Sequence, residues 1–207
     1  MTPLCTLARK HGTDKGGAHL QRGDTCHNYT PFYHELFKDR REDVKNVLEI
    51  GIGGGHSLRM WKEYFPNATI YGVDNNLDCI LYDEKRITCF HADQGSEKDL
   101  TGVMRAIGSL RKIHLMIDDG SHEPAHQIFT AQILLPYLAP DGIYVIEDIE
   151  PDCQPQLIGN PIVDGLMVND RRKNYTWNPL PTGRGIGRAY CRCGCETGEQ
   201  LVVIRHV

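Results

Sequence analysis

Residues 47–74 carry a short apolar run, a glycine cluster, a helical stretch and a second apolar run, in that order. This order limits the possible folds more than any other part of the sequence. Residues 47–50 have the composition of a buried strand, and residues 57–64 space their apolar side chains as a helix does. The second run, residues 69–73, ends on Asp74. We therefore predict a βαβ unit of a parallel sheet.

The rest of the chain continues the alternation of strands and helices. Strands are predicted at 87–91, 113–117, 143–146 and 201–205, with helices at 96–107 and 124–138, a short helix with loops at 75–86 and a turn at 140–142. A helix over 29–37 precedes the unit, with Thr30 as its N-cap and Pro31 in its first turn. The predicted fold is α/β, a Rossmann-like doubly wound sheet, mostly parallel with an antiparallel last strand.

Length and charge restrict the class of protein. A chain of 207 residues suits one α/β domain, and we assign residues 1–207 to it, as a minimal enzyme or a module of a longer chain. The net charge of −4 and the absence of a Lys/Arg-rich block give no case for nucleic acid. No apolar run approaches the roughly 18 residues of a membrane span. The first residues lack a signal-peptide core, and the eight cysteines need no disulfide framework, so we expect a cytoplasmic protein without a membrane partner.

The glycine cluster predicts a nucleoside site. Glycines let a ligand approach the backbone closely, and an acid at the end of the second strand, here Asp74, can accept hydrogen bonds from ribose hydroxyls. The dinucleotide pattern GxGxxG has His56 in place of its last glycine, which disfavours an NAD-dependent oxidoreductase. The alternative is a glycine-rich turn without a ligand.

Acidic side chains follow every predicted parallel strand except the first. They are Asp74, Asp93, Asp118, Asp119, Glu147 and Asp148. Because parallel strands end at one edge of the sheet, Asp119, Glu147 and Asp148 should meet there and hold a hard divalent cation, with Mg²⁺ preferred and Mn²⁺ or Ca²⁺ as alternatives. The alternative is that the acids cap helices or end solvated loops, and Asp93 in particular could cap the next helix. His122, three residues after Asp119, is a candidate general base or else a capping or solvent-facing residue.

Seven segments together resemble one enzyme family. They are GTDKGG (12–17), HNYTPFY (27–33), VLEIGIGGGHSLRMW (47–61), YFPNATIYGVD (64–74), HADQGS (91–96), IDDGSH (117–122) and IEDI (146–149). The chain resembles, over roughly residues 8–150, the metal-dependent sugar O-methyltransferases of the mycinamicin, macrocin and rhamnosyl type. These are class I S-adenosylmethionine (SAM) enzymes, and the cephalosporin hydroxylase-like family shares their scaffold.

The resemblance implies SAM and Mg²⁺ as cofactors and assigns roles to residues. It makes Asp119, Glu147 and Asp148 the metal ligands and His122 the catalytic base. It places the SAM contacts on Glu49, Gly51, Gly53, Asp74, Asp93 and Gln94, and we add Asp118 at the same edge.

The reaction implied is methylation of one hydroxyl of a vicinal diol on a sugar, such as a terminal L-rhamnose of a glycan or glycoside. We expect residues 1–40 to form a lid or helix and residues 150–187, with Arg184, to bind the acceptor. Candidate acceptor contacts are Tyr29, Tyr33, Tyr175 and Trp177, because aromatic faces pack on sugar C–H groups.

Other functions and assemblies stay open at this point. The alternatives are a catechol-type small-molecule O-methyltransferase and a SAM-binding module without activity. The oligomeric state is open between monomer and dimer, and fusion to glycosyltransferase domains is considered. We interpret the cysteines of CRCGC (191–195) as structural thiols rather than a soft-metal site, because no CxxC pair accompanies them.

Overall fold

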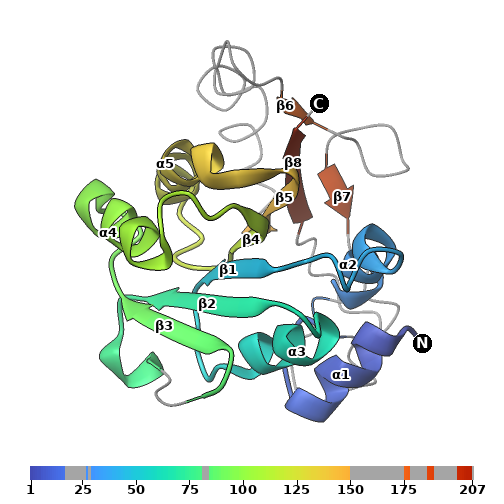
Figure 1. Ribbon diagram of the computed structural model, residues 1–207. Coiled ribbons are helices and arrows are strands. Elements are labelled where there is room, and N and C mark those ends of the chain that lie inside the picture. Colours follow the sequence, from blue (N-terminus) through green and yellow to red (C-terminus); the bar gives the residue numbers. More distant parts are fainter. Residues whose placement is uncertain are drawn as a thin grey trace.

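Five parallel strands, in the order β3-β2-β1-β4-β5, form the centre of the molecule (Figure 1). The computed structural model describes residues 1–16, 27, 29–80, 84–149, 175–177, 186–188 and 200–206. The strands are β1 (Asn46–Ile50), β2 (Thr69–Asp74), β3 (Ile87–His91), β4 (Ile113–Asp118), β5 (Leu138–Ile149), β6 (Tyr175–Trp177), β7 (Ile186–Arg188) and β8 (Gln200–His206). The helices are α1 (Pro3–His11), α2 (Thr30–Phe37), α3 (His56–Tyr64), α4 (Glu97–Ile107) and α5 (Pro124–Leu134), with 3₁₀ turns η2 (Leu77–Cys79) and η3 (Leu135–Tyr137).

The sheet confirms the predicted topology. Strand β8 pairs antiparallel with β5, so the last strand runs against the five parallel ones. The short strands β6 and β7 both pair antiparallel with β8 and were not predicted. Of the helices in the described part of the chain, none is long and apolar enough to span a bilayer.

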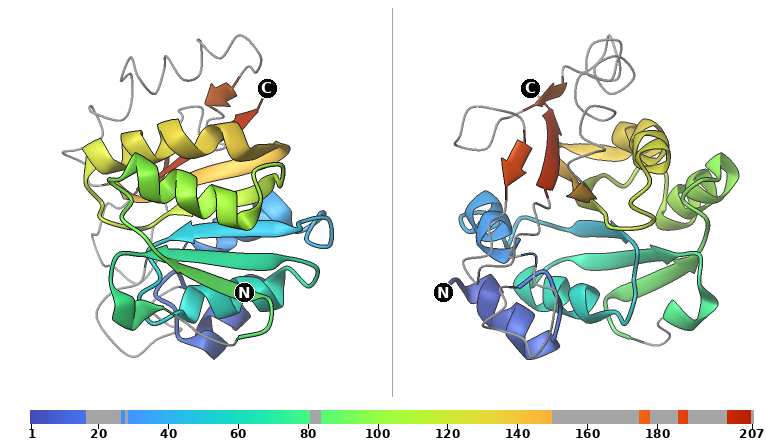
Figure 2. Two further views of the ribbon diagram at one scale, coloured as in Figure 1. Left: turned by 60° about the vertical axis from the view of Figure 1, so that its left-hand side comes forward. Right: turned by 180° about the vertical axis from the view of Figure 1, so that it is seen from behind.

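The sheet separates two helical layers. Helices α4 and α5 lie on one face, and α1, α2 and α3 lie on the other (Figures 1 and 2). Successive strand residues point to opposite faces, and the two cores follow this alternation. Val47 and Leu115 pack with α1–α3, whereas Leu48 and Met116 pack with α4 and α5. The position of a polar residue at the end of a strand therefore determines which helical layer its side chain faces.

Two helix boundaries differ from those predicted. Helix α2 begins at Thr30 with Tyr29 as its N-cap residue, so the predicted N-cap is wrong by one position. The backbone N–H groups of Tyr29 and Thr30 both donate to the Lys15 carbonyl, which fixes this start. Helix α5 ends at Leu134, four residues before the predicted end, and a 3₁₀ turn containing Pro136 follows.

The predicted turn at 140–142 lies inside β5. Ile113 is opposite Leu138 and Leu115 is opposite Ile143, so five residues of β5 span the length of two in β4. The turn-forming residues therefore form an irregularity in a long strand, which continues to Glu147 and Asp148.

Candidate active site

The glycine turn after β1 reaches the loop that follows β4. Gly51 has φ +90°, and a Cβ built on it would lie 2.0 Å from the Asp119 carbonyl oxygen. Only glycine fits this backbone and this approach. The Asp74 carboxylate accepts from the N–H groups of Ile52 (2.8 Å) and Gly53 (3.4 Å), so the end of β2 holds the same turn. The β1, β2 and β4 ends thus form one continuous edge.

A cavity of about 160 Å³ opens at this edge. Four of the predicted cofactor contacts line it, namely Gly51, Asp74, Asp93 and Gln94. Asp93 does not cap α4, because Ser96 does so by accepting from the Asp99 N–H. The cavity lies across the ends of β1, β2 and β3, where a nucleoside site was predicted.

Two of the predicted cofactor contacts lie behind the cavity. Asp118 is fully buried on the α4–α5 side, where it accepts from Gln94 Nε2 (3.1 Å) and the Tyr144 hydroxyl (3.3 Å). Burial raises its pKa to about 6. Glu49 is fully buried on the opposite side and accepts from Trp61 Nε1 (2.8 Å). Neither residue lines the cavity, so the structure gives both a supporting position.

A second cavity, of about 410 Å³, adjoins the first at Gly51, Asp74 and Gly120. The loop after α1, residues 12–15, forms one of its walls. Gly53 lines it as well. Asp119, His122 and Asp148 line the same cavity, so it unites predicted cofactor, metal and base residues.

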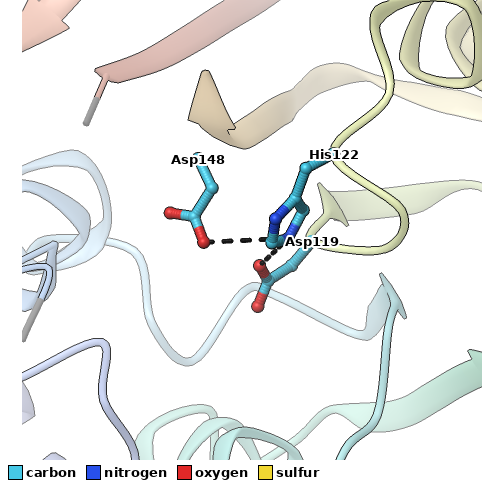
Figure 3. Close-up of side chains that lie close together, drawn as sticks. All are labelled: Asp119, His122 and Asp148. Atoms are coloured by element: carbon cyan, nitrogen blue, oxygen red, sulfur yellow. Dashed lines mark ion pairs between the residues drawn. The ribbon is translucent and has the colours of Figure 1, made fainter. Parts of the chain in front are cut away.

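Asp119, His122 and Asp148 face one another across this cavity (Figure 3). One ligand atom from each lies within 4.8 Å of the others. His122 Nε2 is 3.3 Å from Asp119 Oδ1 and 3.7 Å from Asp148 Oδ2. His122 and Asp148 both have left-handed backbones, with φ 59° and 53°. In β5 this rare conformation interrupts the alternation of side chains between the two faces of the sheet. It turns the Asp148 side chain to the cavity that Asp119 also lines.

Glu147 takes a different position from the other two predicted metal ligands. It is buried, and its two oxygens accept from Lys15 Nζ and the Tyr33 hydroxyl. Among the described residues it is not part of the group that could hold an ion. Of the three predicted ligands, Asp119 and Asp148 therefore lie in one group with His122, whereas Glu147 lies behind them against Lys15 and Tyr33.

Lys15 is the central cation of the site. Its Nζ contacts Asp119 Oδ2 (2.5 Å), Glu147 and Glu49 Oε1 (3.4 Å). Burial alone would lower the pKa of Lys15, but the three acids outweigh it and raise the pKa well above its usual value. Burial would raise the pKa of Asp119, yet Lys15 and His122 lower it to about 2. The hydrogen bond to Asp119 raises the pKa of His122.

Two of the four aromatic residues expected to contact an acceptor lie against the acids of the site. Tyr29 and Tyr33 are fully buried, and the Tyr29 hydroxyl donates to Asp148 Oδ1 (2.5 Å). His27 Nδ1 lies 3.3 Å from the same oxygen. Large aromatic side chains on an amphipathic helix pack inward, and their hydroxyls then need a buried acceptor.

Lys15, His27 and Trp61 belong to the site but were not predicted from the sequence. Lys15 and His27 lie in the GTDKGG and HNYTPFY segments that carry the resemblance. Their place in these segments was the feature of the sequence that could have indicated a role in the site. Tyr175 and Trp177 lie on β6, paired with β8. Arg184, Cys191, Cys193 and Cys195 lie outside the described residues, as does most of the predicted acceptor segment.

The chemistry of the donors fits both cofactors that the resemblance implies. Carboxylate oxygens of Asp119 and Asp148 suit a hard divalent cation, and the acids around them exceed the positive charge of Lys15. A cavity between a glycine turn and an acid at the end of β2 suits a nucleoside.

Known proteins share this fold and sequence. No family model matches the chain. The tetracenomycin-C rhamnosyl 2'-O-methyltransferase of Streptomyces olivaceus is 39% identical over 89% of this chain and 51% of its own length. A crystal structure of a methyltransferase from the mycinamycin pathway, bound to Mg and S-adenosylhomocysteine, matches with TM-score 0.63 and 36% identity, over 76% of this chain and 42% of its own. The chain belongs to the class I SAM-dependent methyltransferases.

Other curated relatives are named as O-methyltransferases as well. Mycinamicin VI 2''-O-methyltransferase of Micromonospora griseorubida is 42% identical over 70% of this chain and 36% of its own length. The chain therefore spans about half, or less, of the length of these curated relatives. The match confirms the predicted family of this class I methyltransferase domain.

Proposed function

We propose that this class I methyltransferase transfers a methyl group from SAM to one hydroxyl of a vicinal diol on a sugar, with Mg²⁺ as metal cofactor. The observation that carries the proposal is the adjacency of two cavities. One is lined by Gly51, Asp74 and Asp93, and the other by Asp119, His122 and Asp148. Such an arrangement sets a methyl donor beside a cation and a base.

Each residue has a distinct task in this proposal. When bound, SAM would supply the methyl group, and Mg²⁺ would lower the pKa of the acceptor hydroxyl. Gly51 and Asp74 hold the nucleoside part of the donor, and Asp93 and Gln94 lie beside its adenine ring. Asp119 and Asp148 would hold the cation, with Glu147 as a further ligand from behind. His122 Nε2 takes the hydroxyl proton, and its half-exposed position gives that proton a path to water.

The acceptor is inferred from the relatives. The protein from Streptomyces olivaceus is named for a rhamnosyl acceptor, and a second protein from that species for the 3'-O-position of a 2-methoxyrhamnosyl group. We therefore propose a deoxyhexose such as L-rhamnose, carried by a glycan or glycoside.

The remaining assignments stay predictions of the sequence. We propose one domain over residues 1–207, with residues 150–187 contributing to the acceptor wall and the reaction located in the cytoplasm. Fusion to a glycosyltransferase and a monomeric or dimeric state are compatible with this proposal.

A panel of acceptors tests the substrate class. The purified protein is given SAM, Mg²⁺ and either methyl α-L-rhamnoside, its 2-deoxy and 3-deoxy analogues, or catechol. We expect transfer to the rhamnoside and strongly reduced transfer to the 3-deoxy analogue, because this analogue has no pair of adjacent hydroxyls for the cation to chelate, whereas the 2-deoxy analogue keeps the pair at C3 and C4. Transfer to catechol but not to the rhamnoside would contradict the sugar assignment and favour a catechol-type enzyme.

A further inference from the structure

Lys15 is buried in a place where lysines are rarely found. Only 1% of the residue is exposed. Lysine is almost never fully buried unless its charge is paired. Its backbone is also fixed, because the Lys15 carbonyl accepts from the N–H groups of Tyr29 (2.9 Å) and Thr30 (3.1 Å) at the start of α2. The position of this ammonium group in the acidic site is therefore fixed by the fold.

Acids from three strands converge on the ammonium group. Glu49 comes from β1, Asp119 follows β4, and Glu147 lies on β5. The strand registers explain the convergence. Glu49 pairs with Gly72 and Ile117, and two residues further along the same face the rows reach Asp119 and Glu147. Without a cation, these buried carboxylates would repel one another and lack the solvation of water.

Asp119 belongs to both halves of the site. Its Oδ2 contacts Lys15, whereas its Oδ1 faces His122. We call Asp119, His122 and Asp148, which line the second cavity, the open group. A cation bound by the open group would share this carboxylate with the lysine. Two positive charges that share one carboxylate repel each other, and each reduces the attraction that the acid offers to the other.

We infer that Lys15 is the resident counter-ion of the acidic cluster and competes with a divalent cation for the charge of Asp119. Lys15 keeps the cluster folded when no divalent cation is bound. It also weakens divalent binding, so that the cation can be exchanged. This inference rests on the proposed cation site and goes beyond it by assigning a role to a residue that does not ligate the cation.

Lys15→Met tests the inference through Mn²⁺ binding, measured by electron paramagnetic resonance. We expect the Mn²⁺ dissociation constant to fall about tenfold or more, because one nearby charge typically shifts proton affinity of an acidic group by about 1–3 log units. We also expect Mn²⁺ to raise the melting temperature of Lys15→Met more than that of the wild type.

Two further variants separate charge from structure. Lys10→Met is the matched control, because Lys10 pairs with Glu63 on the surface of α1, and its Mn²⁺ affinity should equal that of the wild type. The double variant Lys15→Met/Glu49→Gln removes one positive and one negative charge, so its affinity should return toward the wild-type value. A double variant that binds as tightly as Lys15→Met would overturn the electrostatic account.

The remaining outcomes are equally decisive. If folded Lys15→Met binds Mn²⁺ no more tightly than the wild type, Lys15 does not compete with the cation. If Lys15→Met is unfolded in EDTA, refolding on addition of Mn²⁺ supports the inference, and failure to refold contradicts it. If the wild type itself shows no saturable Mn²⁺ binding, the proposed cation site fails, and the inference fails with it.

Discussion

Replacement of Asp119 by Asn is expected to abolish methyl transfer while leaving SAM binding within a few-fold of the wild type. The Asp119 carboxylate contacts Lys15 with one oxygen and faces the open group with the other. It does not line the cavity that we assign to the nucleoside. Loss of a cation worth several kcal/mol in the transition state corresponds to roughly a thousandfold or greater loss of kcat. Turnover, SAM binding by calorimetry and Mn²⁺ binding are measured on the same preparation.

His122→Ala is the informative companion to this variant. We expect a loss of about 10²–10⁴-fold in turnover, the usual contribution of a general base, with Mn²⁺ affinity close to that of the wild type. A marked loss of Mn²⁺ affinity would instead make His122 a ligand, as its place beside Asp119 and Asp148 also permits. Wild-type turnover in Asp119→Asn would contradict the proposed cation site.

Gly51→Ala is expected to destabilise the fold and to eliminate SAM binding. The added Cβ would lie 2.0 Å from the Asp119 carbonyl oxygen and 2.7 Å from its carbonyl carbon. Both atoms are backbone, so the β1–α3 turn or the loop after β4 has to move. The φ of +90° adds strain for any residue with a side chain. Because both loops line the first cavity, either shift changes its shape.

Gly102→Ala is the matched control for this substitution. Gly102 lies within α4, and nothing lies within 4 Å of a Cβ built on it. Alanine in a helix interior is favoured over glycine by about 0.5–1 kcal/mol, so this variant should be slightly more stable than the wild type. Thermal unfolding and SAM calorimetry compare the two variants. A Gly51→Ala protein with wild-type stability and SAM affinity would show that this close approach is not required.

The sequence predicted the sheet and the edge that carries the site because both depend on local patterns. Apolar runs mark β2 and β4, and acids follow directly where these two strands end. Strand alternation, applied to Asp118 and Asp119, would also have separated a buried supporting acid from one at the cavity. That step needs only the rule that neighbouring side chains point to opposite faces.

Other parts of the site depend on tertiary structure and could not be predicted. The left-handed backbone of Asp148 brings it to the cavity against the alternation, and nothing in the sequence signals it. Lys15 lies in a polar, glycine-rich segment, which favours a solvent-exposed turn over a buried position. Tyr33 was expected at an acceptor, yet helix packing buries it against Glu147.

The central claim is that one edge of the sheet holds a SAM site and a separate cation site that act together. The most direct test measures SAM binding and methyl transfer to methyl α-L-rhamnoside, each with Mg²⁺ and with EDTA. We predict SAM binding in both conditions and transfer only with Mg²⁺. Absence of SAM binding in both conditions, or equal transfer in EDTA, would contradict the account.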